Sequence, residues 1–163
     1  MSTSLLRNND LTETVFKRNY TTVYKIAYLR TGNTHDAEDI MQEVFLRYVK
    51  HKPSFENEEH EKAWFIRTAI NRTNSFFTSA WKRRMVITDD TQIDYDECFD
   101  NSILEAVMSL PKDMSTAVHL YYYEDMSIKE ISEAMRKSES AVKSLLFRAR
   151  KLLKIELTDS EKG

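Results

Sequence analysis

The chain has 163 residues, of which 41% are hydrophobic and 11% aromatic, and its formal net charge is −2. This length suits one ordinary domain or two small ones, and the apolar fraction is large enough to form real cores. A near-neutral total excludes a protein that holds duplex DNA by overall charge alone. The single cysteine, Cys98, excludes an internal disulfide and a cysteine-based zinc cluster, which fits a reducing compartment.

The composition also indicates the fold class. Only two Gly and two Pro interrupt the chain, and its β-branched residues rarely alternate with polar ones, so we predict an all-α fold. The first ten residues, MSTSLLRNND, have no apolar core of signal-peptide length. No stretch reaches the roughly 18 apolar residues needed to cross a bilayer. We therefore expect a cytoplasmic protein that does not insert directly into a membrane.

The charges are segmented along the chain. Residues 62–84 carry six Lys and Arg and no acid, whereas residues 89–105 carry seven Asp and Glu and no base. The acidic stretch shows no helical period, so we predict a linker over residues 85–101. Two small helical domains follow from this division, one over residues 10–84 and one over residues 102–157.

Two helices are expected at the start of the first domain. The first has apolar residues at helical spacing and ends at Gly32; they are Leu11, Val15, Tyr20, Val23 and Ala27. The second is capped by Asn33 or Thr34 and ends near Pro53, and its buried stripe consists of Ala37, Met41, Val44, Phe45 and Tyr48. Its opposite face carries Asp39, Gln42, Glu43 and Leu46 at i, i+3, i+4 and i+7. Periodicity does not distinguish a solvated face from a docking site for a basic helix.

A third helix over residues 58–82 mixes cations with many aromatic residues. Trp64, Phe65, Phe76, Phe77 and Trp81 are spaced so closely around the helix that they cannot all face one core. Exposed rings beside Lys and Arg suit single-stranded DNA, because unstacked bases pile on rings while cations neutralise phosphates. The alternative is that one side packs inward through Ala63, Ile66, Ile70 and Phe77, with the rest covered loosely by the first helix.

The second domain has the pattern of a helix-turn-helix. A core helix begins at Pro111 and runs to about Tyr123. Ser127 and Glu130 then form a capping-box pattern that starts a helix burying Ile128, Ile131 and Met135. After a turn at residues 136–137, Ser138 can cap a last helix that buries Val142, Leu145, Ala149 and Leu152 or Leu153. Its free face carries cations, as in a helix that enters the major groove.

Five stretches together resemble a known family. They are DAEDIMQEVF (36–45), AWFIRTAINR (63–72), LP (110–111), SIKEISEAM (127–135) and SESAVKSLLFRARKLL (138–153). In this order and spacing the chain resembles the extracytoplasmic-function (ECF) group of bacterial sigma-70 RNA polymerase sigma factors, from about Val15 to Leu153. The resemblance implies a transcription initiation factor that the polymerase core carries to promoter DNA, with no enzymatic activity and no cofactor.

The resemblance also assigns roles to individual residues. Binding to the clamp helices of the polymerase β′ subunit maps onto Asp39, Gln42, Glu43 and Leu46. Capture of the melted minus-ten element maps onto Trp64, Arg67, Asn71, Arg72, Lys82, Arg83 and Arg84. Reading of the minus-thirty-five element, beside a contact with the β flap, maps onto Ser138, Ser140, Lys143, Ser144, Phe147, Arg148 and Arg150. Members of the family are commonly held inactive by an anti-sigma factor.

Four positions depart from the family pattern. Arg136 stands where Gly is usual, Ala141 where Thr is usual, Leu145 where Arg is usual, and Ser75 where Asp is usual. A left-handed Arg136 would cost about 1 kcal/mol more than Gly. The absent arginine at position 145 removes one phosphate or base contact from the last helix.

Two other classes of function are compatible with the sequence. A stand-alone helix-turn-helix regulator would bind its operator without polymerase, but the chain shows no ligand domain or dimerisation helix. An enzyme or metal-binding bundle would need converging ligands, and only Glu56 and His60, at i and i+4, resemble such a pair.

Overall fold

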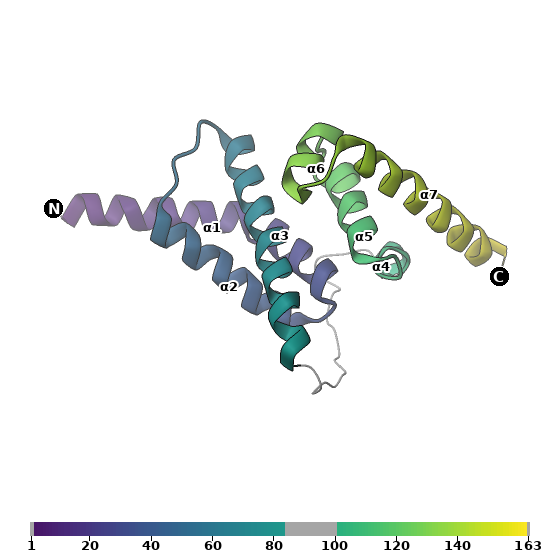
Figure 1. Cartoon of the computed structure of the whole chain (residues 1–163). Helices are drawn as coiled ribbons and strands as arrows, with labels where there is room; N and C mark the ends of the chain where they lie inside the picture. Colours follow the sequence, from purple (N-terminus) through teal and green to yellow (C-terminus); the bar gives the residue numbers. More distant parts are fainter. Residues whose placement is uncertain (1, 84–100, 163) are drawn as a thin grey trace.

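The computed structural model describes the backbone of residues 2–83 and 101–162, and the side chains of residues 11–77 and 105–154. In these ranges the chain is helical, without a strand, as predicted (Figure 1). Its elements are α1 (Ser2–Thr31), α2 (Thr34–His51), α3 (Glu58–Arg83), α4 (Asn101–Met108), α5 (Lys112–Val118), η1 (His119–Tyr123), α6 (Ile128–Met135) and α7 (Glu139–Lys162). The predicted acidic linker and Arg84 lie outside the described residues, except that residue 101 already belongs to α4.

Helices α1, α2 and α3 pack on one another and form the N-terminal bundle. Gly32, with φ +83°, ends α1 in the left-handed region. The Asn33 side chain accepts a hydrogen bond of 2.8 Å from the backbone N–H of Asp36, which confirms the predicted cap of α2. Lys52, with φ 46°, ends α2 directly before Pro53.

The core of the N-terminal bundle differs in part from the predicted stripes. Val15, Val23 and Ala27 are buried, but Leu11 is 62% and Tyr20 40% exposed. The Tyr20 ring stacks on Phe16, and the centres of the Phe16 and Phe45 rings are 4.8 Å apart. This side of α1 therefore lies at the edge of the bundle. The sequence analysis missed several fully buried residues, among them Ile26 and Tyr28 of α1, Ile40 of α2 and Phe65 of α3.

Helices α4 to α7 form the C-terminal bundle, and its local signals are largely confirmed. The Ser127 hydroxyl accepts from the N–H of Glu130 while the Glu130 carboxylate accepts from the N–H of Ser127, a complete capping box. The Ser138 hydroxyl accepts a bond of 3.0 Å from the N–H of Ala141 and so caps α7. Pro111 is the residue before α5 instead of its first residue.

The buried side of α7 is rotated slightly from the prediction. Val142, Leu146 and Ala149 are buried, whereas Leu145 and Leu153 are half-buried and Leu152 is 43% exposed. Helix α7 packs against both α5 and α6, so the buried stripe follows the groove between these two helices.

A single π turn, η1, follows α5 and ends at Glu124. The N–H of Glu124 donates to the carbonyl of His119, and the N–H of Met126 donates to that of Leu120. Asp125 then adopts φ 54°, which reverses the chain toward α6. Inserted π turns are frequent at functional positions. Here the turn directs the Glu124 side chain toward α3.

The two bundles are in contact. Helix α1 packs against α5, and α3 packs against α6, so that the teal and green helices lie side by side in Figure 1. The buried apolar residues of the described chain form one cluster that includes both bundles. No helix in the described ranges combines the length and hydropathy required to cross a membrane.

Candidate functional site

The outer face of α2 is exposed, as its spacing predicted. Asp39, Gln42, Glu43 and Leu46 all face solvent, and Leu46 is 66% exposed. Asp39 lies 3.7 Å from His35, and a Glu43 oxygen lies 4.0 Å from the guanidinium of Arg72. Neither contact buries the carboxylates, so this face remains available to a basic partner.

One side of α3 carries the described residues that were assigned to the minus-ten element. Arg67 is exposed, Asn71 and Arg72 are half-buried, and Arg72 donates a bond of 3.2 Å to the Ser75 hydroxyl. Ser75 therefore contacts Arg72 through a neutral oxygen, at the position where the resemblance leads one to expect Asp. Lys82 and Arg83 belong to α3, but their side chains lie outside the described ones, and Arg84 lies outside the described residues altogether.

Some aromatic residues of α3 are buried in the core and others are partly exposed, so both alternatives left open by the sequence apply in part. Phe65 is fully buried and joins the core together with Ile66 and Ile70. Trp64 is half-buried. The centre of its ring lies 4.9 Å from that of Phe65, 6.3 Å from that of Tyr48 and 6.0 Å from that of Phe55. Trp64 is thus held in an aromatic cluster with part of its surface open. Trp81 lies outside the described side chains.

The outer face of α7 brings together most of the residues assigned to the minus-thirty-five element. An open hollow of about 620 Å³ is lined by Ser140, Lys143, Ser144, Phe147, Arg148 and Arg150. Phe147 is 57% exposed within it. Ser138 is the exception, because its hydroxyl caps the helix. A polar and basic hollow with an exposed ring suits the edges and phosphates of duplex DNA.

Two tyrosines that the sequence analysis missed hold one of these cations. Arg150 donates a bond of 2.7 Å to the Tyr122 hydroxyl, and its guanidinium lies 5.6 Å and 5.7 Å from the rings of Tyr121 and Tyr122. Tyr122 is 52% exposed and so extends the hollow toward η1. The run YYY at residues 121–123 was the available signal.

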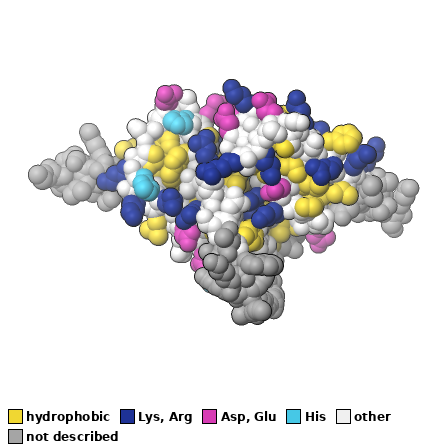
Figure 2. All heavy atoms as spheres, in the orientation of Figure 1, with side chains coloured by type: hydrophobic (Ala, Val, Ile, Leu, Met, Phe, Trp, Pro, Cys, Tyr) yellow, Lys and Arg dark blue, Asp and Glu magenta, His cyan; other side chains and the backbone are white. Residues whose placement is uncertain are grey.

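Charge is distributed unevenly over the surface. Figure 2 shows Lys and Arg side chains gathered across the middle of one face, over both bundles. On the right, where Figure 1 places α7, hydrophobic side chains lie beside Lys and Arg. The acidic stretch of the segmented sequence, residues 89–105, lies outside the described side chains except for Glu105.

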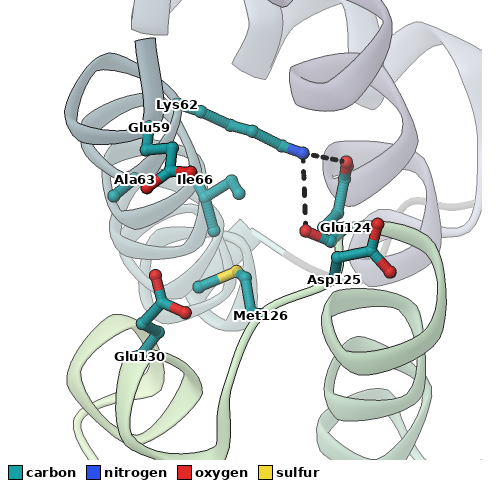
Figure 3. Close-up of a pocket in the computed structure, with 8 residues that line it drawn as sticks. All are labelled: Glu59, Lys62, Ala63, Ile66, Glu124, Asp125, Met126 and Glu130. Carbon is teal, nitrogen blue, oxygen red and sulfur yellow. Dashed lines mark hydrogen bonds and ion pairs between the residues drawn. The ribbon is translucent and has the colours of Figure 1, made fainter. Parts of the chain in front are cut away.

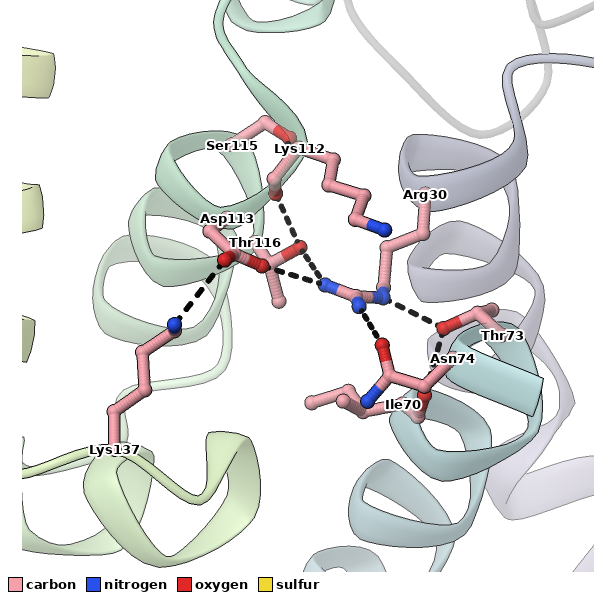
Figure 4. A network of polar contacts seen from close by, with 9 residues as sticks. All are labelled: Arg30, Ile70, Thr73, Asn74, Lys112, Asp113, Ser115, Thr116 and Lys137. Carbon is pink, nitrogen blue, oxygen red and sulfur yellow. Dashed lines mark hydrogen bonds and ion pairs between the residues drawn. The ribbon is translucent and has the colours of Figure 1, made fainter. Parts of the chain in front are cut away.

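Arg30 is buried between the bundles, and the sequence analysis did not single it out (Figure 4). It donates bonds of 2.6 Å to the Thr73 hydroxyl and to the side-chain Oδ1 of Asn74 in α3, and one of 3.0 Å to the Thr116 hydroxyl of α5. It also lies 3.5 Å from Asp113. Burial lowers the pKa of Arg30, and Asp113 opposes that effect.

A second polar contact between the bundles surrounds Glu124 (Figure 3). Lys62 of α3 lies 3.0 Å from the Glu124 carboxylate, and His119 Nε2 lies 3.4 Å from it without hydrogen-bond geometry. Burial would raise the pKa of Glu124, but His119 and Lys62 hold it at about 2. The pair borders a cleft of about 300 Å³ between α3 and α6, whose lining includes three further acids, Glu59, Asp125 and Glu130.

Glu56 and His60, the pair that resembles metal ligands in the sequence, form a hydrogen bond with each other. His60 Nδ1 accepts a bond of 3.1 Å from the backbone N–H of Glu56, so this ring nitrogen is already engaged by the backbone. This geometry gives the pair a role in the turn before α3.

Comparisons with known proteins agree over most of the chain. Residues 15–83 match the family model described as Sigma-70 region 2, and residues 100–153 match Sigma-70, region 4. The sequence is 30% identical over 144 residues to the RNA polymerase sigma factor SigV of Bacillus subtilis (strain 168), covering 85% of this chain and 86% of that protein. It is 32% identical over 142 residues to the ECF RNA polymerase sigma factor SigM of the same strain, covering 81% and 86%.

A solved structure shares the fold. The sigma factor RpoE from Bartonella quintana, determined in complex with the anti-sigma factor NepR, superposes with a TM-score of 0.68 and 18% identity. The match covers 93% of this chain and 97% of that one.

Proposed function

Because the chain belongs to the ECF group of the sigma-70 family of RNA polymerase sigma factors, we propose that its two bundles divide the work of promoter recognition between them. Sigma factors are not enzymes; they bind the polymerase core and direct it to specific promoters. In this proposal residues 10–84 bind the core and the melted minus-ten element. Residues 102–157 read the minus-thirty-five element beside the β flap, and residues 85–101 join them. The place of action is the cytoplasm.

The observation that carries the proposal is the open hollow on α7. Its residues come from the first three turns of the second helix of a helix-turn-helix, the part that enters the major groove in such motifs. Lys143 and Arg148 offer donors for phosphates or guanine edges, and Phe147 offers an apolar contact for a thymine methyl group. Few cations face the DNA, so additional binding energy from the polymerase core is required.

Polymerase binding is assigned to the exposed face of α2, through Asp39, Gln42, Glu43 and Leu46. A basic helix can pair with the two carboxylates while its apolar residues cover Leu46. For the minus-ten element the proposed contacts are Arg67, Asn71, Arg72 and the open part of Trp64, followed by Lys82, Arg83 and Arg84. An anti-sigma factor is a further proposed partner, since the Bartonella relative is described in complex with one.

A double charge reversal tests the polymerase contact. Asp39→Lys with Glu43→Lys should abolish binding to core polymerase in an anisotropy titration, while the melting temperature changes little, because both carboxylates are exposed. Glu38→Lys is the matched control, since Glu38 is an exposed acid of α2 outside this face. Unchanged core affinity in the folded double variant would show that the face is merely solvated.

A further inference from the structure

Arg150, one of the cations that line the hollow on α7, is held by another element. Its Nε donates a bond of 2.7 Å to the Tyr122 hydroxyl of η1, and its guanidinium lies 5.6 Å and 5.7 Å from the ring centres of Tyr121 and Tyr122. Arg148, in contrast, bonds within the described residues only to the carbonyl of Ser144 in its own helix. Arg150 is therefore pre-organised, so that less rotamer entropy is lost when it binds a ligand.

The position of Tyr122 is set by the core of the C-terminal bundle. Helix α5 packs against α7 and continues directly into η1. His119 and Leu120 at the start of η1 are 3% and 0% exposed, whereas Tyr122 is 52% exposed. The buried part of this turn anchors its backbone, and the exposed part presents the phenol at the surface, where it meets Arg150 of α7.

Most hydrogen-bond donors of this pair are unused. A guanidinium has five N–H groups and no acceptor, and a phenol both donates and accepts. The Tyr122 oxygen accepts from Nε of Arg150, so its own O–H group needs a different acceptor. In the part of the chain that the structure describes, neither this O–H group nor the terminal N–H groups of Arg150 have one. These donors therefore remain available to a ligand.

The ligand that fits these donors is an anion. Arg150 pairs with no carboxylate among the described side chains, and the two tyrosines that hold it are neutral. Arg18 and Arg30 differ, because each lies beside a carboxylate, at 2.7 Å and 3.5 Å. The charge of Arg150 is thus not neutralised within the protein. The planar N–H groups of arginine match the oxygens of a phosphate, and the phenol adds a further donor.

The place of the pair along α7 indicates which phosphate it meets. Ser140, Lys143 and Ser144 lie in the first two turns of α7, the part that enters the major groove in helix-turn-helix proteins. Arg150 lies about 16 Å along the helix axis from Glu139, the first residue of α7. This distance exceeds the major-groove width of about 12 Å, so Arg150 meets the backbone at the edge of the groove instead of the bases.

We propose that Tyr122 and Arg150 form a phosphate-binding site for the DNA backbone at the edge of the minus-thirty-five element. The terminal N–H groups of Arg150 and the O–H group of Tyr122 donate to one phosphate, and the bond between the two side chains holds them in place. This inference rests on the function proposed above and adds Tyr122 to its DNA-binding residues. Arg150 then fixes the position of α7 on the duplex, while the sequence is read by other residues of the hollow.

Uncharged phosphates in the promoter duplex test the site directly. The full chain is combined with core polymerase, and its affinity is measured by anisotropy for duplexes that carry one methylphosphonate at successive positions along the upstream element. The parent should lose about tenfold in affinity at one phosphate beside the element, because a charged hydrogen bond is lost there. On the unmodified duplex, Arg150→Ala should lose about as much and Tyr122→Phe about threefold.

The combination of protein and DNA changes identifies the contact. Neutralising the same phosphate should cost Arg150→Ala nothing more, and it should cost Tyr122→Phe less than the parent. All other phosphates should matter equally to the parent and the variants. Arg150→Ala should also make the salt dependence shallower by about 0.9, the value for one phosphate, whereas Arg150→Lys should keep the salt dependence and still lose affinity.

Tyr123→Phe is the matched control. It removes the same hydroxyl group from the next residue of η1, which is 49% exposed, and should leave both the affinity and the phosphate pattern unchanged. Circular dichroism identifies any variant that has lost its helices. Tyr122→Phe removes a single oxygen from an exposed side chain, so it decides the test if Arg150→Ala does not fold.

The outcomes separate the phosphate site from the proposed function. A parent that binds core and promoter, with the same phosphate pattern in Tyr122→Phe and Arg150→Ala, would overturn the site alone. Equal losses on every duplex would also overturn it and would assign the pair to folding or to a contact with polymerase. If the parent binds neither core nor promoter, the proposed function fails and the site fails with it.

Discussion

Arg136, in the turn of the helix-turn-helix, is a non-glycine residue with a left-handed backbone conformation. It ends α6 with φ 57° and ψ 47°, the left-handed region in which the family has Gly. Its N–H still donates to the carbonyl of Ser132, so the cap forms with an arginine in place. Arg136 therefore adopts the left-handed conformation at an energy cost relative to Gly.

Replacing Arg136 with Gly should stabilise the protein. The side chain is exposed, so little contact is lost, and relief of the left-handed strain outweighs the added entropy of the unfolded chain by about 0.5 kcal/mol. Urea denaturation followed by circular dichroism measures the change. Glu133→Gly, in the right-handed interior of α6, should instead destabilise by about 1 kcal/mol. A loss of stability in Arg136→Gly would mean that the arginine makes a contact of its own.

The low pKa of Glu124 predicts that the free energy of unfolding decreases at acidic pH. Its pKa in the folded protein is about 2, below the ordinary 4.5, so the ionised form stabilises the fold above pH 4.5. This contribution, on the order of 3 kcal/mol for a side chain that is 9% exposed, is lost as the pH falls from 4.5 toward 2. Lys62 and His119 face the carboxylate, and both remain in a Glu124→Gln variant.

The stability difference between the parent and Glu124→Gln should therefore be large at pH 6 and small near pH 2. Chemical denaturation across this range gives the difference at each pH. Glu105→Gln, at an exposed acid of α4, supplies the reference for a carboxylate outside the contact. A difference that does not vary with pH would contradict the assignment of the low pKa to Glu124.

At the scale of elements, capping signals were predictable and burial was less so. Asn33, the box of Ser127 and Glu130, and Ser138 act within four residues, so the sequence carries all the information that a cap needs. Which side of a helix is buried depends on neighbours that periodicity does not identify. Leu11 and Leu145 were assigned to the core for this reason, and both lie at its edge or outside it.

The features of the candidate site that belong to one helix were predictable, whereas contacts between distant segments were not. Helical spacing predicted the exposed faces of α2 and α7 because each face belongs to one helix. Spacing gave no indication of Arg30, whose partners Thr73 and Thr116 lie 43 and 86 residues away. The capture of Arg150 by Tyr122, 28 residues away, was likewise beyond local patterns.

Helix α7 should act only where its DNA element is present. Lys143→Ala and Arg148→Ala should weaken transcription from a promoter with an intact upstream element several-fold, because each removes a contact worth about 1 kcal/mol or more. Both variants should match the parent when that element is scrambled. Lys154→Ala, at an exposed cation of α7 outside the hollow, serves as the matched control in the same run-off assay. Equal losses on both templates would assign these residues to folding or to polymerase contact.

The whole molecule explains how a chain of net charge −2 can act on DNA. Its acidic face on α2 and its basic hollow on α7 belong to different bundles. In the proposed function the N-terminal bundle binds polymerase, and the rest of the chain would then confine the C-terminal bundle near its element and raise its effective concentration. The free chain has few phosphate contacts, so its own binding should be weak, with a shallow salt dependence of about 0.9 per neutralised phosphate.

The most direct measurement compares promoter use by the full chain with and without core polymerase. Genomic fragments are transcribed in vitro with core alone and with core plus the chain, the transcript starts are mapped, and the same fragments are titrated with the chain alone. We predict new starts that share one two-part upstream sequence, appear only when chain and core are combined, and lie on fragments that the free chain binds weakly. Tight, sequence-specific binding by the free chain, with no new starts in the presence of core, would contradict the account and favour a stand-alone regulator.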